Sequence, residues 1–416
     1  MCYKRIVSVI VFGVILNSVT IAQGEAAIPF LLLPISPSQN AMGATGTSIP
    51  TDDPYGFLIN PAQLGHTSQT TNLSFIFYPS KVNWLGFDGL TLSGIALNLG
   101  YNFKNLVGIP LSIGFGFANP ELNYGEFFRT GGGDPNPNGT FEPKDYYNEY
   151  SLGIGIDCFV QLNAGVTYKD ITSILSDRPI GEESGYGRAE VSTIDYGFLL
   201  NIPIIKLIDD KLSINIIDDI PIKPYLNFST GYARSNIGDE VYYIDPAQSD
   251  PLPRTARLGY GISLGFDFLI DESPFSFIKL DFSVDAEDIL IERASFMYGF
   301  KYQNGIGDID IGRNIIQIKG DDKVVTHSGY RIYLMETLGI TNGKFSGRGF
   351  DLSTTSGIEI RATGLLKMLG KYSSDKVFEF IANHFDLRYY RTTYSSNKFD
   401  TEMDGIALFI SRLEFN

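Results

Sequence analysis

A Gly-x-Ser-x-Gly motif at residues 261–265, centred on Ser263, is the first pattern in the sequence that could support catalysis. Serine hydrolases hold such a serine on a sharp turn between a strand and a helix, where its hydroxyl can attack a substrate. Here the motif lies inside an alternating run from Ala256 to Phe268, with no helix pattern after it and no histidine close in sequence. We interpret Ser263 as a strand residue. No set of nucleophile, histidine and carboxylate can be assembled, so we expect no enzyme.

A second pattern, at residues 134–145, has the spacing of a calcium-binding loop. Oxygen-bearing side chains occupy loop positions 1, 3, 5, 9 and 12, with glycine at position 6; they are Asp134, Asn136, Asn138, Glu142 and Asp145. Against this reading, no helix pattern flanks the loop, and a loop rich in Pro, Asn and Gly has the same composition through turn chemistry alone. Weak calcium binding is therefore a hypothesis beside an ordinary external loop, and we expect no other cofactor.

Histidines and cysteines are too few and too scattered for a zinc or iron–sulfur site. The histidines are His66, His327 and His384, and the cysteines are Cys2 and Cys158. We expect the histidines at the surface or at a rim, and Cys158 as a small apolar residue at a strand edge. The net charge of −15 argues against binding to nucleic acid through a basic surface.

Residues 1–22 have the order of a secretory signal peptide. Lys4 and Arg5 precede an apolar run over Ile6–Leu16, and small residues at Thr20 and Ala22 then favour cleavage near Gln23. A single membrane-anchoring helix is the alternative, but it needs about 20 apolar residues. We expect Sec-dependent export.

The elements that must position any site are strands, because apolar and small residues alternate over long windows. The clearest windows are 95–103, 111–118, 150–157 and 256–268. A soluble sandwich would turn the apolar set into a core, whereas a membrane barrel turns it toward lipid. The polar faces are mainly Gly, Ser, Ala and Asn, and the windows run to about 10–14 residues, which suits spanning strands. The last apolar positions, Ala407, Phe409, Leu413 and Phe415, share one face.

The sequence therefore predicts an all-β fold, a transmembrane antiparallel β-barrel of about 14 strands over residues 71–416. Two stretches depart from the strand pattern. Residues 365–384 show helical spacing and are expected to form a helical insertion at one rim. Residues 218–224 contain two prolines, which predict a turn or a strand break.

Between the predicted signal peptide and the barrel, residues 23–70 follow neither periodicity. Gly43 and Gly46 permit tight turns, and Asn60 can cap a short helix that begins with Pro61 and Ala62. Asp52 and Asp53 can accept hydrogen bonds from backbone amides or pair with basic side chains in the lumen. We expect this segment to plug the barrel, although an ordinary surface loop would use the same residue types.

The plug segment also resembles a known family. Its motifs are, in order, Phe30–Ser36, Ala41-Met42-Gly43-Ala44-Thr45-Gly46, Asp52-Asp53 and Asn60-Pro61-Ala62. This order is similar to the start of the PorV/PorQ proteins, accessories of type IX secretion, which are related to the FadL fatty acid transporters. The resemblance implies a FadL-like barrel with a plugged lumen in the bacterial outer membrane. It also implies protein partners from the secretion apparatus or its cargo, besides outer-membrane lipid. A FadL-like transporter of hydrophobic small molecules is the alternative.

Overall fold

The computed structural model describes residues 26–129, 139–176, 186–217, 220–270, 273–293, 299–370, 375–396 and 399–413. The predicted signal peptide lies outside these ranges. None of the helices within them is long and apolar enough to cross a membrane.

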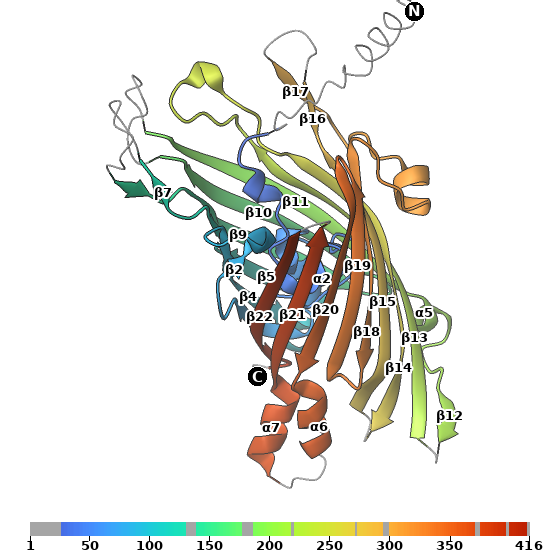
Figure 1. Cartoon of the computed structure of the whole chain (residues 1–416). Coiled ribbons are helices and arrows are strands. Elements are labelled where there is room, and N and C mark those ends of the chain that lie inside the picture. Colours follow the sequence, from blue (N-terminus) through green and yellow to red (C-terminus); the bar gives the residue numbers. More distant parts are fainter. Residues whose placement is uncertain are drawn as a thin grey trace, which may run out of the picture.

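Fourteen antiparallel strands form a closed barrel, because β1 pairs with β4 on one side and with the last strand, β22, on the other (Figure 1). The predicted fold class is confirmed. The wall strands are β1 (Thr71–Phe77), β4 (Ile95–Asn102), β5 (Leu111–Ala118), β9 (Lys144–Asp157), β10 (Gln161–Ile174), β11 (Arg188–Pro203), β13 (Ile220–Gly238), β14 (Thr255–Ile270), β15 (Ser273–Ile289), β18 (Val324–Leu334), β19 (Leu338–Gly347), β20 (Phe350–Arg361), β21 (Phe385–Ser396) and β22 (Phe399–Ser411).

The two ends of the barrel differ in their connections. At one end, which we call the helix rim, lie α4 (Lys104–Val107), α5 (Ile204–Ile208), β12 (Ile214–Ile217), α6 (Thr363–Gly370) and α7 (Lys376–His384). The predicted helical insertion is confirmed as α6 and α7. The other end, the loop rim, carries β2 (Val82–Asn83), η3 (Trp84–Gly86), β3 (Thr91–Ser93), β6 (Glu121–Asn123), β7 (Phe127–Phe128), β8 (Thr140–Phe141), η4 (Pro246–Gln248), β16 (Ile291–Arg293), β17 (Phe300–Tyr302) and η5 (Ile311–Ile316).

The polarity of the wall is that of a membrane barrel. In β9 the apolar residues Leu152, Ile154 and Ile156 are exposed on the outside, whereas the alternate residues Ser151 and Gly153 are buried against the lumen contents. A soluble sandwich would bury the apolar set instead, so that alternative is wrong.

The last strand departs from the expected polarity. A membrane barrel should turn the apolar set of a strand toward lipid, but Ala407 and Phe409 of β22 face the lumen, where the Phe409 ring packs under the Arg388 guanidinium at 3.8 Å.

The turn or strand break predicted over residues 218–224 falls between β12, which ends at Ile217, and β13, which begins at Ile220, and the two residues between them lie outside the described ranges. The prolines themselves, Pro221 and Pro224, lie within β13. Pro224 is tolerated because β13 pairs there with β14 only, and its pairing with β11 begins at Asn227.

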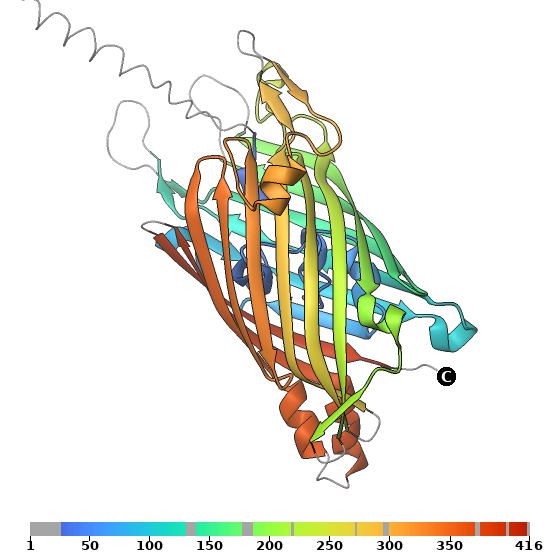
Figure 2. The same ribbon diagram turned by 90° about the vertical axis from the view of Figure 1, so that its right-hand side faces the viewer.

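Residues 26–70 run through the barrel from one rim to the other, and Figure 2 shows them between the walls. They contain η1 (Pro29–Leu32), α2 (Pro37–Ala41), η2 (Gly56–Leu58) and α3 (Gln63–Thr67). At the loop rim the amide of Ala27 donates to the carbonyl of Pro251 (2.8 Å). At the helix rim the amide of Arg412 donates to the carbonyl of Thr70 (3.0 Å), directly before β1 begins. We call residues 26–70 the plug.

The plug touches the wall backbone to backbone at Gly43. This residue has φ +74°, and a Cβ atom added to it would lie 2.6 Å from the carbonyl oxygen of Ser328 and 2.8 Å from the amide nitrogen of Lys344. On the wall side, a Cβ atom on Gly343 would collide with the backbone of Gly43. Glycine is therefore required on both sides of this contact.

We predict that Gly43→Ala lowers the free energy of unfolding by about 3 kcal/mol. About 1 kcal/mol comes from the left-handed backbone, and the remainder from overpacking. The matched control is Gly108→Ala, which has φ +70° but no atom within 4 Å of the added Cβ, so about 1 kcal/mol is expected. Denaturant unfolding of the refolded barrel measures both, and equal losses would contradict the close contact.

Candidate functional site

The first part of the plug, α2, is anchored to the strands around it. Ser36 caps the helix by accepting a hydrogen bond from the Gln39 amide (3.0 Å), and Pro37 occupies its first turn. Thr392 of β21 donates to the Pro37 carbonyl (2.6 Å). Because α2 ends at Ala41, the next residues, Met42 and Gly43, turn toward β18 and β19.

His327 of β18 takes part in the same contact. Its Nδ1 lies 2.8 Å from the carbonyl oxygen of Gly43, and the side chain is buried between plug and wall. The expectation that His327 lies at the surface or a rim is wrong, since a lumen filled by the plug buries wall residues that an open lumen would expose. His66 lies in α3 of the plug, and His384 ends α7 at the helix rim.

Asp285 of β15 holds the turn that follows Gly43. Its Oδ2 accepts hydrogen bonds from the amides of Gly46 (2.8 Å) and Thr47 (2.9 Å), and its Oδ1 accepts one from the Ser48 hydroxyl (2.6 Å). The carboxylate is fully buried. These three donors replace the hydrogen bonds to water that the carboxylate loses on burial.

The Asn60-Pro61-Ala62 element packs against the opposite wall. Asn60 Oδ1 accepts from the Ala62 amide (3.0 Å), and its Nδ2 donates to the carbonyls of Thr47 (2.7 Å) and Phe198 (3.1 Å). A side chain on Gly197 would collide with Asn60, and one on Gly165 would collide with Pro61. The neighbouring Gln63 donates to the carbonyls of Gly46 (2.9 Å) and Ile49 (2.8 Å) and joins the two halves of the plug.

The adjacent carboxylates of the plug have different roles. Asp52 points outward to Arg388 of β21 (2.7 Å) and lies 3.8 Å from Arg361 of β20. Asp53 points inward, where it accepts from the Tyr55 amide (3.0 Å) and from the Ser36 hydroxyl. Asp52 thus joins plug to wall, whereas Asp53 stabilises the fold of the plug itself.

Arg388 is the centre of the contact between Asp52 and the wall. Besides Asp52 it binds Asp386 (2.6 Å) and lies 3.7 Å from Glu359, and only 8% of its side chain is exposed. Arg361 pairs with Glu359 (2.6 Å) and stacks on Tyr333 at 4.0 Å. We call the contact of Asp52 with Arg388 and Arg361 the latch.

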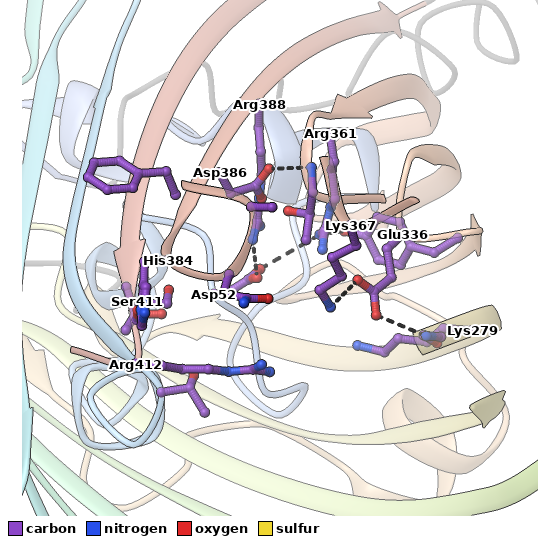
Figure 3. Close-up of a pocket in the computed structure, with 18 residues that line it drawn as sticks. Asp52, Lys279, Glu336, Arg361, Lys367, His384, Asp386, Arg388, Ser411 and Arg412 are labelled. Carbon is purple, nitrogen blue, oxygen red and sulfur yellow. Dashed lines mark hydrogen bonds and ion pairs between the residues drawn. The ribbon is translucent and has the colours of Figure 1, made fainter. Parts of the chain in front are cut away.

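Beneath the latch, toward the helix rim, the lumen is hollow. Two cavities of about 270 and 410 Å³ share four lining residues, Ser276, Lys279, Glu336 and Arg412, and form one polar vestibule. Figure 3 shows Asp52, Arg361, Lys367 and Arg388 directed into it. Lys367 of α6 pairs with Glu336 (2.6 Å), so the cations of this end are largely matched by carboxylates.

On the loop side of the plug, a small pocket of about 50 Å³ has apolar and charged walls. The plug contributes the run Leu31–Ile35, and the barrel contributes Lys169, Arg257 and Glu287. Lys169 pairs with Asp195 (2.6 Å), and Arg257 donates to Glu287 through Nε (2.6 Å). We call this the mouth pocket.

The remaining candidates from the sequence lie elsewhere. Asp134, Asn136 and Asn138 fall outside the described residues; Glu142 is exposed, and Asp145 is buried in β9, where Tyr124 donates to it (2.6 Å). Within the described ranges no three His, Cys, Asp or Glu side chains are grouped to hold a metal ion. Calcium binding by this loop therefore stays a prediction.

Ser263 lies in the middle of β14 and donates to Asp281 (2.7 Å), in a strand rather than in a nucleophile turn. Cys158 is exposed in the turn between β9 and β10.

Sequence reasoning missed Asp285, Arg361 and Arg388, which hold the plug. A signal was present, because each occupies a lumen-facing position of an alternating strand. In β15, Lys279, Asp281, Ser283, Asp285 and Glu287 alternate with apolar residues. Charges on the inward face of a strand indicate that something polar lies in the lumen.

No protein-family model matches the chain, and no curated protein matches it. Several solved barrels have a similar fold. They include the CymD monoaromatic hydrocarbon channel (TM-score 0.43, 8% identity, 92% of this chain and 98% of that one). The toluene transporters TodX of P. putida (0.36, 9%, 91% and 98%) and TbuX of Ralstonia pickettii (0.32, 11%, 92% and 98%) are also among them. Scores and identities this low carry no argument about function, and nothing here supports PorV/PorQ specifically.

We predict that Arg388→Met lowers the free energy of unfolding by about 3 kcal/mol, because it leaves buried carboxylates without their partner. Asp52→Asn should cost about 1 kcal/mol, since the Asp52 side chain is 37% exposed to the vestibule. The control is Arg391→Met on the same strand, whose pair with Glu402 is exposed, and about 0.5 kcal/mol or less is expected. Denaturant unfolding measures all three. A loss for Arg388→Met no greater than for the control would contradict the latch.

Proposed function

We propose that the chain is a gated transporter of small apolar or amphipathic molecules in the bacterial outer membrane, reached by Sec-dependent export. This is the FadL-like alternative from the sequence. The observation that carries it is that the lumen is closed by the plug, a segment that precedes the wall strands in sequence, rather than by the side chains of the wall itself.

The lumen-facing side of the wall leaves space for the plug. Its lumen-facing positions include Gly165, Gly197, Gly231 and Gly343, all of which touch the plug. A barrel serving only as a scaffold can fill its interior with large side chains, as small barrels do. Here the space is occupied by a chain segment held through hydrogen bonds and ion pairs, which can exchange with water when the segment moves.

The mouth pocket suggests the class of solute. Apolar side chains from Leu31 to Ile35 line one side of it, which suits a ligand with an apolar body. Across the pocket, Lys169 and Arg257 are each paired with a carboxylate, Asp195 and Glu287. At about 50 Å³ the pocket has room for little beyond ordered water. Passage therefore requires the plug to move.

A second candidate is an accessory of protein secretion of the PorV/PorQ type, with protein partners from that apparatus or its cargo. The order of the amino-terminal motifs favours it, as does the acidic and aromatic loop around Tyr243, Asp245 and Asp250 at the loop rim. In outer-membrane barrels the longer loops face the cell exterior, where such a loop would meet a folded partner.

We predict that Leu32→Glu reduces uptake of a fluorescent long-chain fatty acid by cells at least fivefold, because it places a carboxylate in the mouth pocket. Gln248→Glu adds the same charge at an exposed position of the same rim and should leave uptake unchanged. Heat-modifiable migration on gels confirms that both variants fold. Uptake no faster with the wild-type chain than without it would overturn the transporter proposal.

Affinity purification from the outer membrane separates the two candidates. Co-purification of a fatty acid or hydrocarbon without protein supports the transporter. Recovery of a stoichiometric protein partner without such a ligand would favour the secretion accessory.

A further inference from the structure

On the outside of the barrel, the apolar band ends toward the loop rim at a level where the outward-facing side chains become polar. On the side of β9–β11, outward-facing side chains change from apolar to polar at Asn148, Asp170 and Ser192, which are register neighbours. Just below them Tyr150 faces Tyr168, and aromatic residues commonly mark the boundary of the lipid region. From this edge the apolar face of β9 continues to Ile156 at the helix rim.

On the side of β19–β22 the same edge lies much nearer to the helix rim. Asn342 pairs with Ser356, and next to them Arg391 pairs with Asp404, all on outward faces. Arg391 and Glu402 form an exposed ion pair here, and charged side chains are destabilising on a lipid-facing surface, so this level is expected to meet water. Below it, the exposed apolar residues on the outward faces of these strands are Leu338, Ile340, Ile358, Ile360, Leu387 and Leu408.

The wall strands are too short on this side to cover the lipid core. From Asn342 to Leu338, the first residue of β19, the strand advances roughly 13 Å along its own direction. Apolar bands of outer-membrane barrels are about 25 Å tall. Some other element at the helix rim must therefore supply the missing apolar surface.

Helices α6 and α7 stand at this place, directly after β20 and directly before β21 (Figure 1). Their exposed side chains form one apolar surface, which we call the hairpin face: Leu365, Met368, Leu369, Val377, Phe380 and Ile381. These residues are between 40% and 66% exposed, and soluble surfaces rarely group so many large apolar side chains.

The hairpin face looks away from the lumen. Lys367, on the opposite side of α6 from Leu365 and Leu369, pairs with Glu336 in the vestibule. Ala382 of α7 is buried and lines the same vestibule, whereas Val377 and Phe380 lie on the other side of that helix. The polar residues of α7, Lys376 and Glu379, form a third, separate stripe.

Other connections at the helix rim repeat the pattern. Phe159, in the turn after β9, and Ile208, at the end of α5, are each 81% exposed. Leu106 and Val107 of α4 are also more than half exposed. The apolar surface thus surrounds the rim rather than forming one patch, which a lipid leaflet matches better than a single docked protein.

We propose that the hairpin face is inserted into the membrane leaflet at the helix rim, with acyl chains as its partner, and that it completes the apolar band where β19–β22 are short. Three features support lipid as the partner: the place of the hairpin between β20 and β21, whose outward faces carry Ile358 and Leu387, the missing height of the band, and the amphipathic division of α7. This inference rests on the barrel architecture and not on the proposed transport function.

The test uses the full chain in vesicles of phosphatidylcholine and phosphatidylglycerol, in a C2S/C158S background. Single cysteines replace Leu369 and Phe380, with Ile358→Cys as the lipid-facing reference and Glu379→Cys as the matched control on the polar stripe of α7. Each carries a bimane label, and vesicles with and without nitroxide-labelled phospholipid are compared. Heat-modifiable migration confirms folding of each variant.

Labels at positions 369 and 380 should be quenched within twofold of the label at 358 and at least threefold more than the label at 379. Iodide, a quencher dissolved in the buffer, should quench the label at 379 more strongly than the labels at 369, 380 and 358. Lipid quenching at 369 and 380 as weak as at 379 would overturn the proposal, and would leave a protein partner as the occupant of the hairpin face.

Discussion

The close approach of two backbones, plug against barrel wall, is the constraint on which the rest of the structure depends. Gly43 meets β18 and β19 where no Cβ atom fits, and the wall glycines 165, 197, 231 and 343 allow the same approach elsewhere. Because the contact is this close, it excludes water and buries many of the polar groups beside it. Buried polar groups need partners, and Asp285, Asn60 and Arg388 supply several of them.

Each wall strand borders two environments, the plug in the lumen and the lipid outside. Inside, charged residues at alternate positions of β15, β20 and β21 meet the plug. Outside, the intervening residues meet lipid. Where β19–β22 fall short of the lipid core, the structure provides α6 and α7, whose lumenal side lines the vestibule through Lys367 while their apolar side faces away. A single helical hairpin therefore serves both the floor of the lumen and the apolar band.

The strand periodicity predicted the all-β barrel, and the helical spacing of residues 365–384 predicted α6 and α7, because both patterns are local. Local sequence does not determine which face of a strand points into the lumen and which points to lipid. Phe409 belongs to the apolar face of the last strand, which a membrane barrel should turn toward lipid, yet it lies in the lumen under Arg388. His327 is expected at the surface or at a rim, yet it contacts Gly43 across a sequence separation of 284 residues. Such positions depend on what fills the lumen, and strand alternation does not encode that.

Residues 26–70 close a barrel that would otherwise be open. Single-channel conductance in planar bilayers measures this closure directly, when the whole chain is compared with a variant that lacks residues 30–65 but retains all wall strands. We expect the whole chain to conduct only rarely and weakly, and the shortened chain to form a stable open pore with a conductance at least tenfold larger. Equal conductance of the two correctly folded barrels would show that the plug does not close the lumen.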